Sequence, residues 1–163
     1  MRVTSSPTVW RRGLVAPIGR VALWLAIVTT SAAAQRPTVE YLQPFGKPTR
    51  PFSPAVRVGN LVLLAGQIGT DAAANGGVVP GGIQAETRQT LENIKQVLTA
   101  IGLTMDDVVK CTVFMADMKE WDAMNAVYRT YFKPERLPAR SALGANGLAL
   151  NARVEIECMA AAQ

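Results

Sequence analysis

The sequence contains no histidine, so it lacks both the commonest metal ligand of proteins and the usual general base. It has only two cysteines, Cys111 and Cys158, which are too few and too far apart in the chain for a zinc site. Any catalysis must therefore rest on carboxylates, arginine, backbone groups and water. We predict that the protein has no metal site.

Acidic residues are missing from the first 34 positions, which nevertheless contain Arg2, Arg11, Arg12 and Arg20. The whole chain has 17 basic and 12 acidic residues, so the part after residue 34 contains 13 basic and 12 acidic residues. The net charge of +5 thus arises almost entirely from the first segment, and the rest shows no stripe of lysine and arginine. We predict no nucleic-acid partner. A hydrophobic content of 49% with 18% charged residues is typical of a globular protein and argues against disorder.

The apolar run Val21–Val28 is well short of the roughly 20 residues that a membrane-spanning helix needs. It follows a basic region that ends at Arg20 and precedes the small residues Ser31–Ala34, a pattern typical of a secretory signal peptide. We predict that residues 1–34 are a signal peptide cleaved near Ala34/Gln35. The mature protein would be exported to the periplasm and keep no membrane span. An uncleaved anchor or a start codon assigned too early remains an alternative.

Residues 35–52 contain four prolines and predict an N-terminal arm with one short edge strand at 38–42. The domain proper is predicted to cover residues 53–163. It opens with a β-hairpin in which Gly59-Asn60 joins strands at 53–58 and 61–68. Residues 70–82 are rich in glycine, alanine and aspartate and predict a loop.

Two helices and three further strands are predicted downstream. Apolar residues at helical spacing predict a helix over 83–101 that ends at Gly102, and residues 108–115 predict a strand. Asp117 and Glu120 match a capping box that opens a second helix through Phe132. Two strands then complete the chain. The element order ββ-α-β-α-ββ predicts a mixed α+β fold with both helices on one face of a sheet.

Arg140 stands at the start of the first of these last strands, directly after a loop that contains Pro138. A guanidinium there offers a planar fork that holds a carboxylate through two parallel hydrogen bonds. Further along, Glu155 supplies a carboxylate that can orient a water molecule. These two groups are the minimum needed to hydrolyse a small substrate that carries an acid.

Six segments of the chain resemble the Rid (RidA/YjgF) family, in unbroken order from about Ser53 to Ala160. They are Ala65–Ile68, Arg88–Lys95, Val108–Phe114, Met124–Tyr128, Pro138–Ser141 and Val154–Glu157. The resemblance implies a chorismate-mutase-like fold, assembled as a homotrimer with a small-molecule site at each subunit interface. It also implies hydrolysis of reactive enamines and imines, such as 2-aminoacrylate, to a 2-keto acid and ammonia without metal or cofactor.

The same resemblance assigns roles to individual residues. Arg140 would bind the substrate carboxylate, Glu155 would orient the attacking water and Asn125 would help to line the pocket. Gly66 and Gln67 would form the neighbouring strand edge, and Ala142 would contribute its backbone carbonyl.

Three positions depart from the family pattern. Deaminases of this group tend to have tyrosine where this chain has Ala55, serine where it has Ala65 and cysteine where it has Ala142. Ala142 matters least because alanine retains the carbonyl. Ala55 and Ala65 remove two hydroxyl groups from the pocket that the resemblance implies and enlarge it.

Structural roles compete with several of these assignments. Arg140 could instead form an ion pair across a subunit interface, and Asn125 could make a buried structural hydrogen bond. Arg153, Glu155 and Glu157 alternate onto one strand face, where they would also form a solvated charge ladder. The aromatic residues of the second helix are expected in the core. Cys111 and Cys158 are expected as buried, unpaired thiols. A disulfide between them is the alternative for an exported protein, if the two strands bring their α-carbons within range.

Three functions follow, in order of preference. The first is hydrolysis of an enamine or imine in which Arg140 holds the carboxylate and Glu155 positions water. The second is a trimer that binds small carboxylates without catalysis, suggested by Ala55 and Ala65. RNA cleavage, a property of some Rid relatives, ranks last because a near-neutral body gives it no electrostatic basis.

Overall fold

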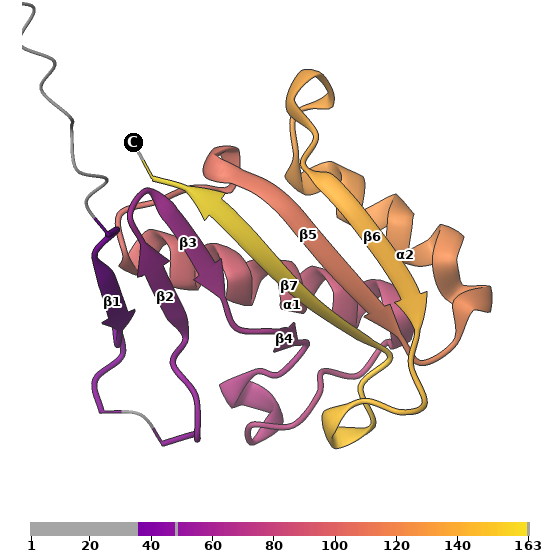
Figure 1. Cartoon of the computed structure of the whole chain (residues 1–163). Helices are drawn as coiled ribbons and strands as arrows, with labels where there is room; N and C mark the ends of the chain where they lie inside the picture. The colour runs from indigo at the N-terminus through magenta and orange to yellow at the C-terminus, as the bar shows by residue number, and fades with distance from the viewer. Residues whose placement is uncertain (1–35, 48, 163) are drawn as a thin grey trace, which may run out of the picture. The chain divides into compact units, whose positions relative to one another are not determined.

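The computed structural model describes residues 36–47 and 49–162, and in that part of the chain seven strands form one sheet (Figure 1). The strands are β1 (Val39–Leu42), β2 (Ala55–Val58), β3 (Leu61–Leu64), β4 (Gln67–Ile68), β5 (Val108–Met115), β6 (Ala139–Gly144) and β7 (Val154–Ala161). Their order is β1-β2-β3-β7-β5-β6, and β4 also pairs with β7. The predicted signal peptide and its cleavage point lie outside the described residues.

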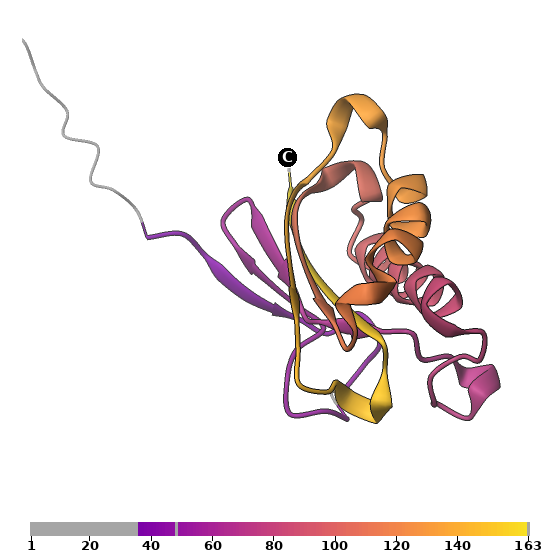
Figure 2. The ribbon, with the colours of Figure 1, turned by 90° about the vertical axis from the view of Figure 1, so that its right-hand side faces the viewer.

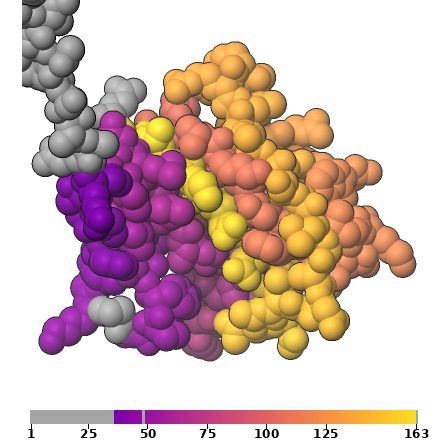
Figure 3. Space-filling view, viewed as in Figure 1, coloured from indigo at the N-terminus to yellow at the C-terminus, as the bar shows by residue number. Residues whose placement is uncertain are grey.

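Two helices, α1 (Gly82–Ala100) and α2 (Trp121–Tyr128), cover one face of the sheet and leave the other face open (Figure 2). This arrangement confirms the predicted mixed α+β fold. Figure 3 looks onto the open face, where atoms of β7 run between those of β3 and β5. Within residues 36–47 and 49–162, neither helix is both long and apolar enough to cross a membrane.

The hairpin turn forms as predicted, because Gly59 adopts a positive φ of 58° and lets Val58 pair with Leu61. The predicted strand over 61–68 is interrupted, however. Leu63 pairs with Met159 and Gln67 with Ile156, so the chain advances one residue more on the β3–β4 side than on β7. This extra residue is a bulge that separates β3 from β4.

The first helix matches its prediction closely and ends where Gly102, at φ 78°, lets Leu103 N–H donate to Leu98 O. The second helix is shorter than predicted. It ends at Tyr128, and a 3₁₀ turn, Arg129–Tyr131, carries the chain to Phe132. The predicted capping box is also wrong, because the Asp117 side chain accepts from Lys119 N–H while Glu120 pairs elsewhere.

Strand alternation divides side chains between the core and the open face. In β7 the buried residues are Val154, Ile156, Cys158 and Ala160, and the partly exposed Glu155, Glu157 and Met159 lie between them. In β5 the register shifts between Val108 and Lys110, so Val109 is 45% exposed. Strict alternation would place Val109 on the same face as Cys111, but the bulge reverses the alternation at this point.

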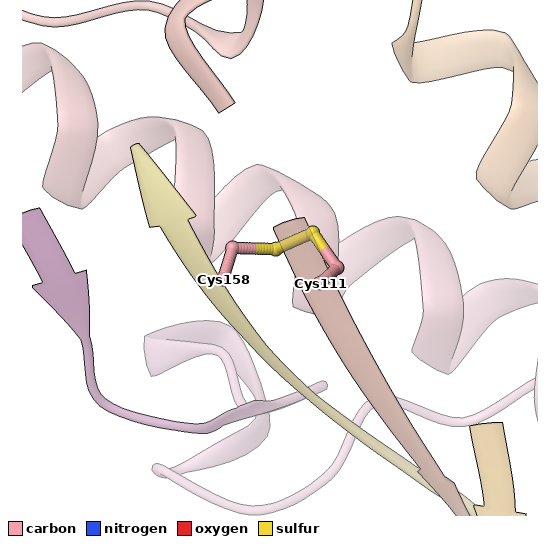
Figure 4. The surroundings of a disulfide bond; sticks show 2 residues. All are labelled: Cys111 and Cys158. Carbon is pink, nitrogen blue, oxygen red and sulfur yellow. A yellow bond between two sulfur atoms is a disulfide. The ribbon is translucent and has the colours of Figure 1, made fainter. Parts of the chain in front are cut away.

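The two cysteines form a disulfide, which corrects the prediction of two free thiols (Figure 4). Cys111 on β5 and Cys158 on β7 are direct partners across the antiparallel pair, and both side chains are buried. The sequence identified two buried cysteines in strands but did not reveal that the two strands are neighbours. Once β5 and β7 pair in this register, the two side chains stand directly opposite each other, and their sulfur atoms come within bonding range.

We predict that the disulfide contributes about 2–4 kcal/mol to the free energy of unfolding, because it closes a long loop in the unfolded chain. The cysteines are 47 residues apart in sequence. Urea unfolding should show Cys111→Ala, Cys158→Ala and the double variant destabilised by similar amounts, since either substitution removes the same bond. Losses that add in the double variant, or unchanged midpoints, would contradict this.

Candidate functional site

Arg140 projects from β6 on the helix-covered face of the sheet. Its parallel partner on β5 is Cys111, whose side chain lies in the core, and in-register residues share a face. The Nη1 group of Arg140 donates to Asn125 Oδ1 at 2.6 Å. Its Cζ atom lies 4.9 Å from the ring centre of Trp121 and 4.6 Å from that of Tyr128.

Helix α2 supplies all three of these contacts from one face. Trp121, Asn125 and Tyr128 are four and three residues apart, which places them in a stripe along the helix. Each ring attracts the guanidinium through its quadrupole, and the amide oxygen fixes the direction of one N–H. The sequence assigned the two aromatic residues to the core. Tyr128 is indeed buried, but both rings also hold Arg140.

The guanidinium opens into a cleft of about 520 Å³ between α2 and the loop before β6. The lining comprises Asn125, Tyr128, Arg129, Phe132, Pro134, Leu137, Pro138 and Arg140, and no acidic residue. Among the described residues, Arg140 forms no ion pair with a carboxylate, so its remaining N–H groups are available to a ligand. Burial raises the pKa of Tyr128 to about 12, which keeps the phenol neutral beside the cation.

Glu155 lies on the open face of the sheet, between Ile68 of β4 and Phe114 of β5. Its carboxylate rests against Gly66 so closely that a Cβ atom at position 66 would stand 2.1 Å from Glu155 Oε1. Any larger residue at position 66 would displace the carboxylate. Burial raises the pKa of the Glu155 carboxyl above its usual value, and the nearby Glu157 charge raises this pKa further.

The predicted site residues therefore fall into two groups. Arg140 and Asn125 meet on the helix-covered face, whereas Glu155 and Gly66 meet on the open face. Within one chain the sheet separates the two groups, so the structure does not bring the arginine and the glutamate together.

The three alanines that depart from the family pattern also have definite places. Ala55 is 1% exposed and packs in the core of this chain, and its predicted effect on the pocket stays a prediction. Ala142 is half-buried on the Arg140 side of β6, and Ala65 is half-buried next to Gly66. Gln67 folds back and donates to the carbonyl of Ala65 at 3.2 Å.

Arg153 belongs to neither group and corrects the predicted charge ladder. It precedes β7 and turns to the helix side, where its Nη1 pairs with Glu120 at 2.6 Å and its Nε lies 3.6 Å from Glu86. Its backbone N–H also donates to Glu86 Oε2. This network fixes the chain at Arg153, directly before β7 and two residues before Glu155. It also holds Glu120, the neighbour of Trp121. Sequence patterns gave no signal for it, because the three residues are far apart in the chain.

Metal ligation finds no support in the described part of the chain, where no three acidic, cysteine or histidine side chains gather to share an ion. The chemistry available is thus a fixed guanidinium in a cleft and a carboxylate of raised pKa beside a glycine.

Comparisons with known proteins agree with this architecture. A family model described as Endoribonuclease L-PSP matches residues 44–162. A RutC family protein of Pyrococcus horikoshii is 44% identical over 114 residues, covering 70% of this chain and 89% of its own length. The 2-iminobutanoate/2-iminopropanoate deaminase of Mus musculus is 42% identical, covering 68% of this chain and 80% of its own length.

Solved structures give the same result. The crystal structure of the YjgF gene product from E. coli superposes with a TM-score of 0.65 at 30% identity. The match covers 80% of this chain and all of that protein.

We predict that Glu157→Gln lowers the pKa of Glu155 without restoring its usual value, because burial is the larger cause of the shift. A ¹³C NMR titration of the side-chain carboxyl groups measures this. Since the raised pKa disfavours the ionised form in the folded state, Glu155 should contribute more to stability as the pH falls through that pKa. A Glu155 pKa that does not respond to Glu157→Gln would contradict the assigned cause.

Proposed function

Because the chain belongs to the Endoribonuclease L-PSP (Rid) family, we propose that it hydrolyses enamines or imines of small 2-amino acids. The products would be 2-keto acids and ammonia. The observation that carries this proposal is Arg140, which faces a cleft and lacks a carboxylate partner among the described residues. The kinship with a mouse 2-iminobutanoate/2-iminopropanoate deaminase supports the choice of substrate class.

In the proposed mechanism, Arg140 binds the substrate carboxylate through its free N–H groups. The rings of Trp121 and Tyr128 and the amide of Asn125 hold the guanidinium in place before the substrate arrives. The arginine side chain therefore loses little conformational entropy when the substrate binds. The bound acid then presents its imine carbon in one orientation.

Glu155 acts in this mechanism as the general base. Its ionised carboxylate accepts a proton from water as the water oxygen bonds to the imine carbon, and the protonated carboxyl group then gives this proton to the imine nitrogen. The resulting carbinolamine passes its hydroxyl proton through the Glu155 carboxylate to the amino nitrogen as the C–N bond breaks, so ammonia leaves and the keto group forms. A carboxylate of raised pKa suits this step, because it holds a proton more strongly than an ordinary glutamate.

A homotrimer would supply the geometry that one chain lacks. Arg140 and Glu155 lie on opposite faces of the sheet, so the arginine of one subunit must meet the glutamate of another for both to touch one substrate. We therefore propose a site shared between neighbouring subunits. This proposal also accounts for the open sheet face, which the chain leaves uncovered.

Binding of small carboxylates without hydrolysis is the second candidate. The separation of the two groups favours it, since the arginine, its amide partner and its two rings form a complete acid-binding group within one chain. Tight binding of 2-ketobutyrate with no turnover of any imine would support this alternative. RNA cleavage is not proposed, although the family description names an endoribonuclease, because the chain after residue 34 is near neutral.

We also propose that the protein works after export, in an oxidising compartment. Two independent observations support this. The first 34 residues have the pattern of a signal peptide, and the two cysteines are joined in a disulfide. Disulfides persist in secreted and periplasmic proteins and are rare in reducing cytosol.

We predict that Arg140→Gln lowers kcat/KM for freshly generated 2-iminopropanoate by roughly 10- to 100-fold, the effect of losing charge-assisted hydrogen bonds. Arg140→Lys should recover only part of the activity because it lacks the fork. Arg88→Gln, an exposed charge on α1, is the matched control and should leave the rate unchanged. The proposal fails if wild type, Arg140→Gln and buffer release keto acid equally fast.

We predict that the full chain, produced in a bacterium with a periplasm, is recovered there with Gln35 as its first residue. Mass spectrometry of the intact and the denatured, thiol-alkylated protein measures both the cleavage point and the oxidation state. The mass should correspond to residues 35–163 with no alkylated cysteine. An uncleaved chain in the cytosol carrying two alkylated cysteines would contradict the export proposal.

A further inference from the structure

A second guanidinium shares the cleft with Arg140. Arg129 follows the last residue of α2 and lines the same cleft. Its Nε donates to the backbone oxygen of Asn125 at 3.3 Å, while Arg140 binds the side-chain oxygen of the same residue. The two cations therefore flank a single residue of the helix.

Neither charge is compensated in the part of the chain that the structure describes. No carboxylate of those residues pairs with Arg129 or Arg140, and the cleft lining contains no acid. A structural role for Arg129 is available, because basic side chains favour the C-terminal end of a helix and bond to its last carbonyls. That role uses only Nε, and the two terminal nitrogens of the guanidinium remain free for a ligand.

Apolar residues also line the cleft. Phe132, Pro134 and Leu137 offer contact to the carbon chain of a ligand, whereas Arg129 itself is exposed. A ligand with one carboxylate would satisfy Arg140 and leave the second guanidinium without a partner.

We propose that the cleft prefers 2-imino and 2-oxo acids that carry a second carboxylate at the far end of a short carbon chain. Arg140 binds the carboxylate next to the reacting carbon, and Arg129 binds the distal one. This inference rests on the proposed function only for the role of Arg140 as the ligand of the first carboxylate.

Two stable ligands test the preference without catalysis. 2-Oxoglutarate and 2-oxopentanoate have the same five-carbon chain and differ only in the terminal carboxylate. Calorimetry on the full chain at low salt should show 2-oxoglutarate bound about fivefold more tightly, the range of an exposed ion pair. Arg129→Gln should abolish the difference by weakening 2-oxoglutarate alone, and Arg88→Gln should preserve it. Added salt should narrow the difference for the wild type, since the distal ion pair is exposed.

Each outcome decides the matter. Equal affinities, or tighter binding of 2-oxopentanoate, would overturn the inference and assign the cleft to apolar side chains. A preference that survives in Arg129→Gln would also overturn it. Binding of 2-oxoglutarate with the expected preference, but no turnover of any imine, would remove the hydrolase proposal and leave this inference standing.

Discussion

The contact between one arginine and two aromatic rings fixes the rest of the candidate site. A free arginine side chain has many rotamers and loses about 2 kcal/mol of entropy when it is held. Here the rings of Trp121 and Tyr128 and the amide of Asn125 hold Arg140 in the unliganded chain, so that loss occurs on folding and not on binding. The helix that carries them is only eight residues long, and its position on the sheet determines where the guanidinium points.

The period of a β-strand imposes the second constraint. Neighbouring side chains of a strand point to opposite faces, and register transmits that division across the sheet. Through this division Arg140 lies with the core cysteines, while Glu155 lies with the exposed side chains. The single chain thus contains an acid-binding group and a base on two sides of one layer. Within one chain the two groups therefore cannot touch the same small molecule.

Local patterns revealed much of this architecture. Apolar spacing located α1 and α2, the Gly59-Asn60 pair located the hairpin, and alternation located the buried side of β7. Two of the corrections share one cause, which is contact between distant segments. The disulfide depends on the pairing of β5 with β7, and the Arg153 network joins residues from three elements. None of these pairings leaves a periodic trace in the sequence.

The buried position of the disulfide limits when it can form or be reduced. Both sulfur atoms lie in the core of the folded protein, where dissolved thiols do not reach them. The oxidation state is therefore decided while the chain is still folding and is then preserved. The oxidation state of the two cysteines in a folded molecule therefore indicates whether the chain folded in an oxidising or a reducing compartment.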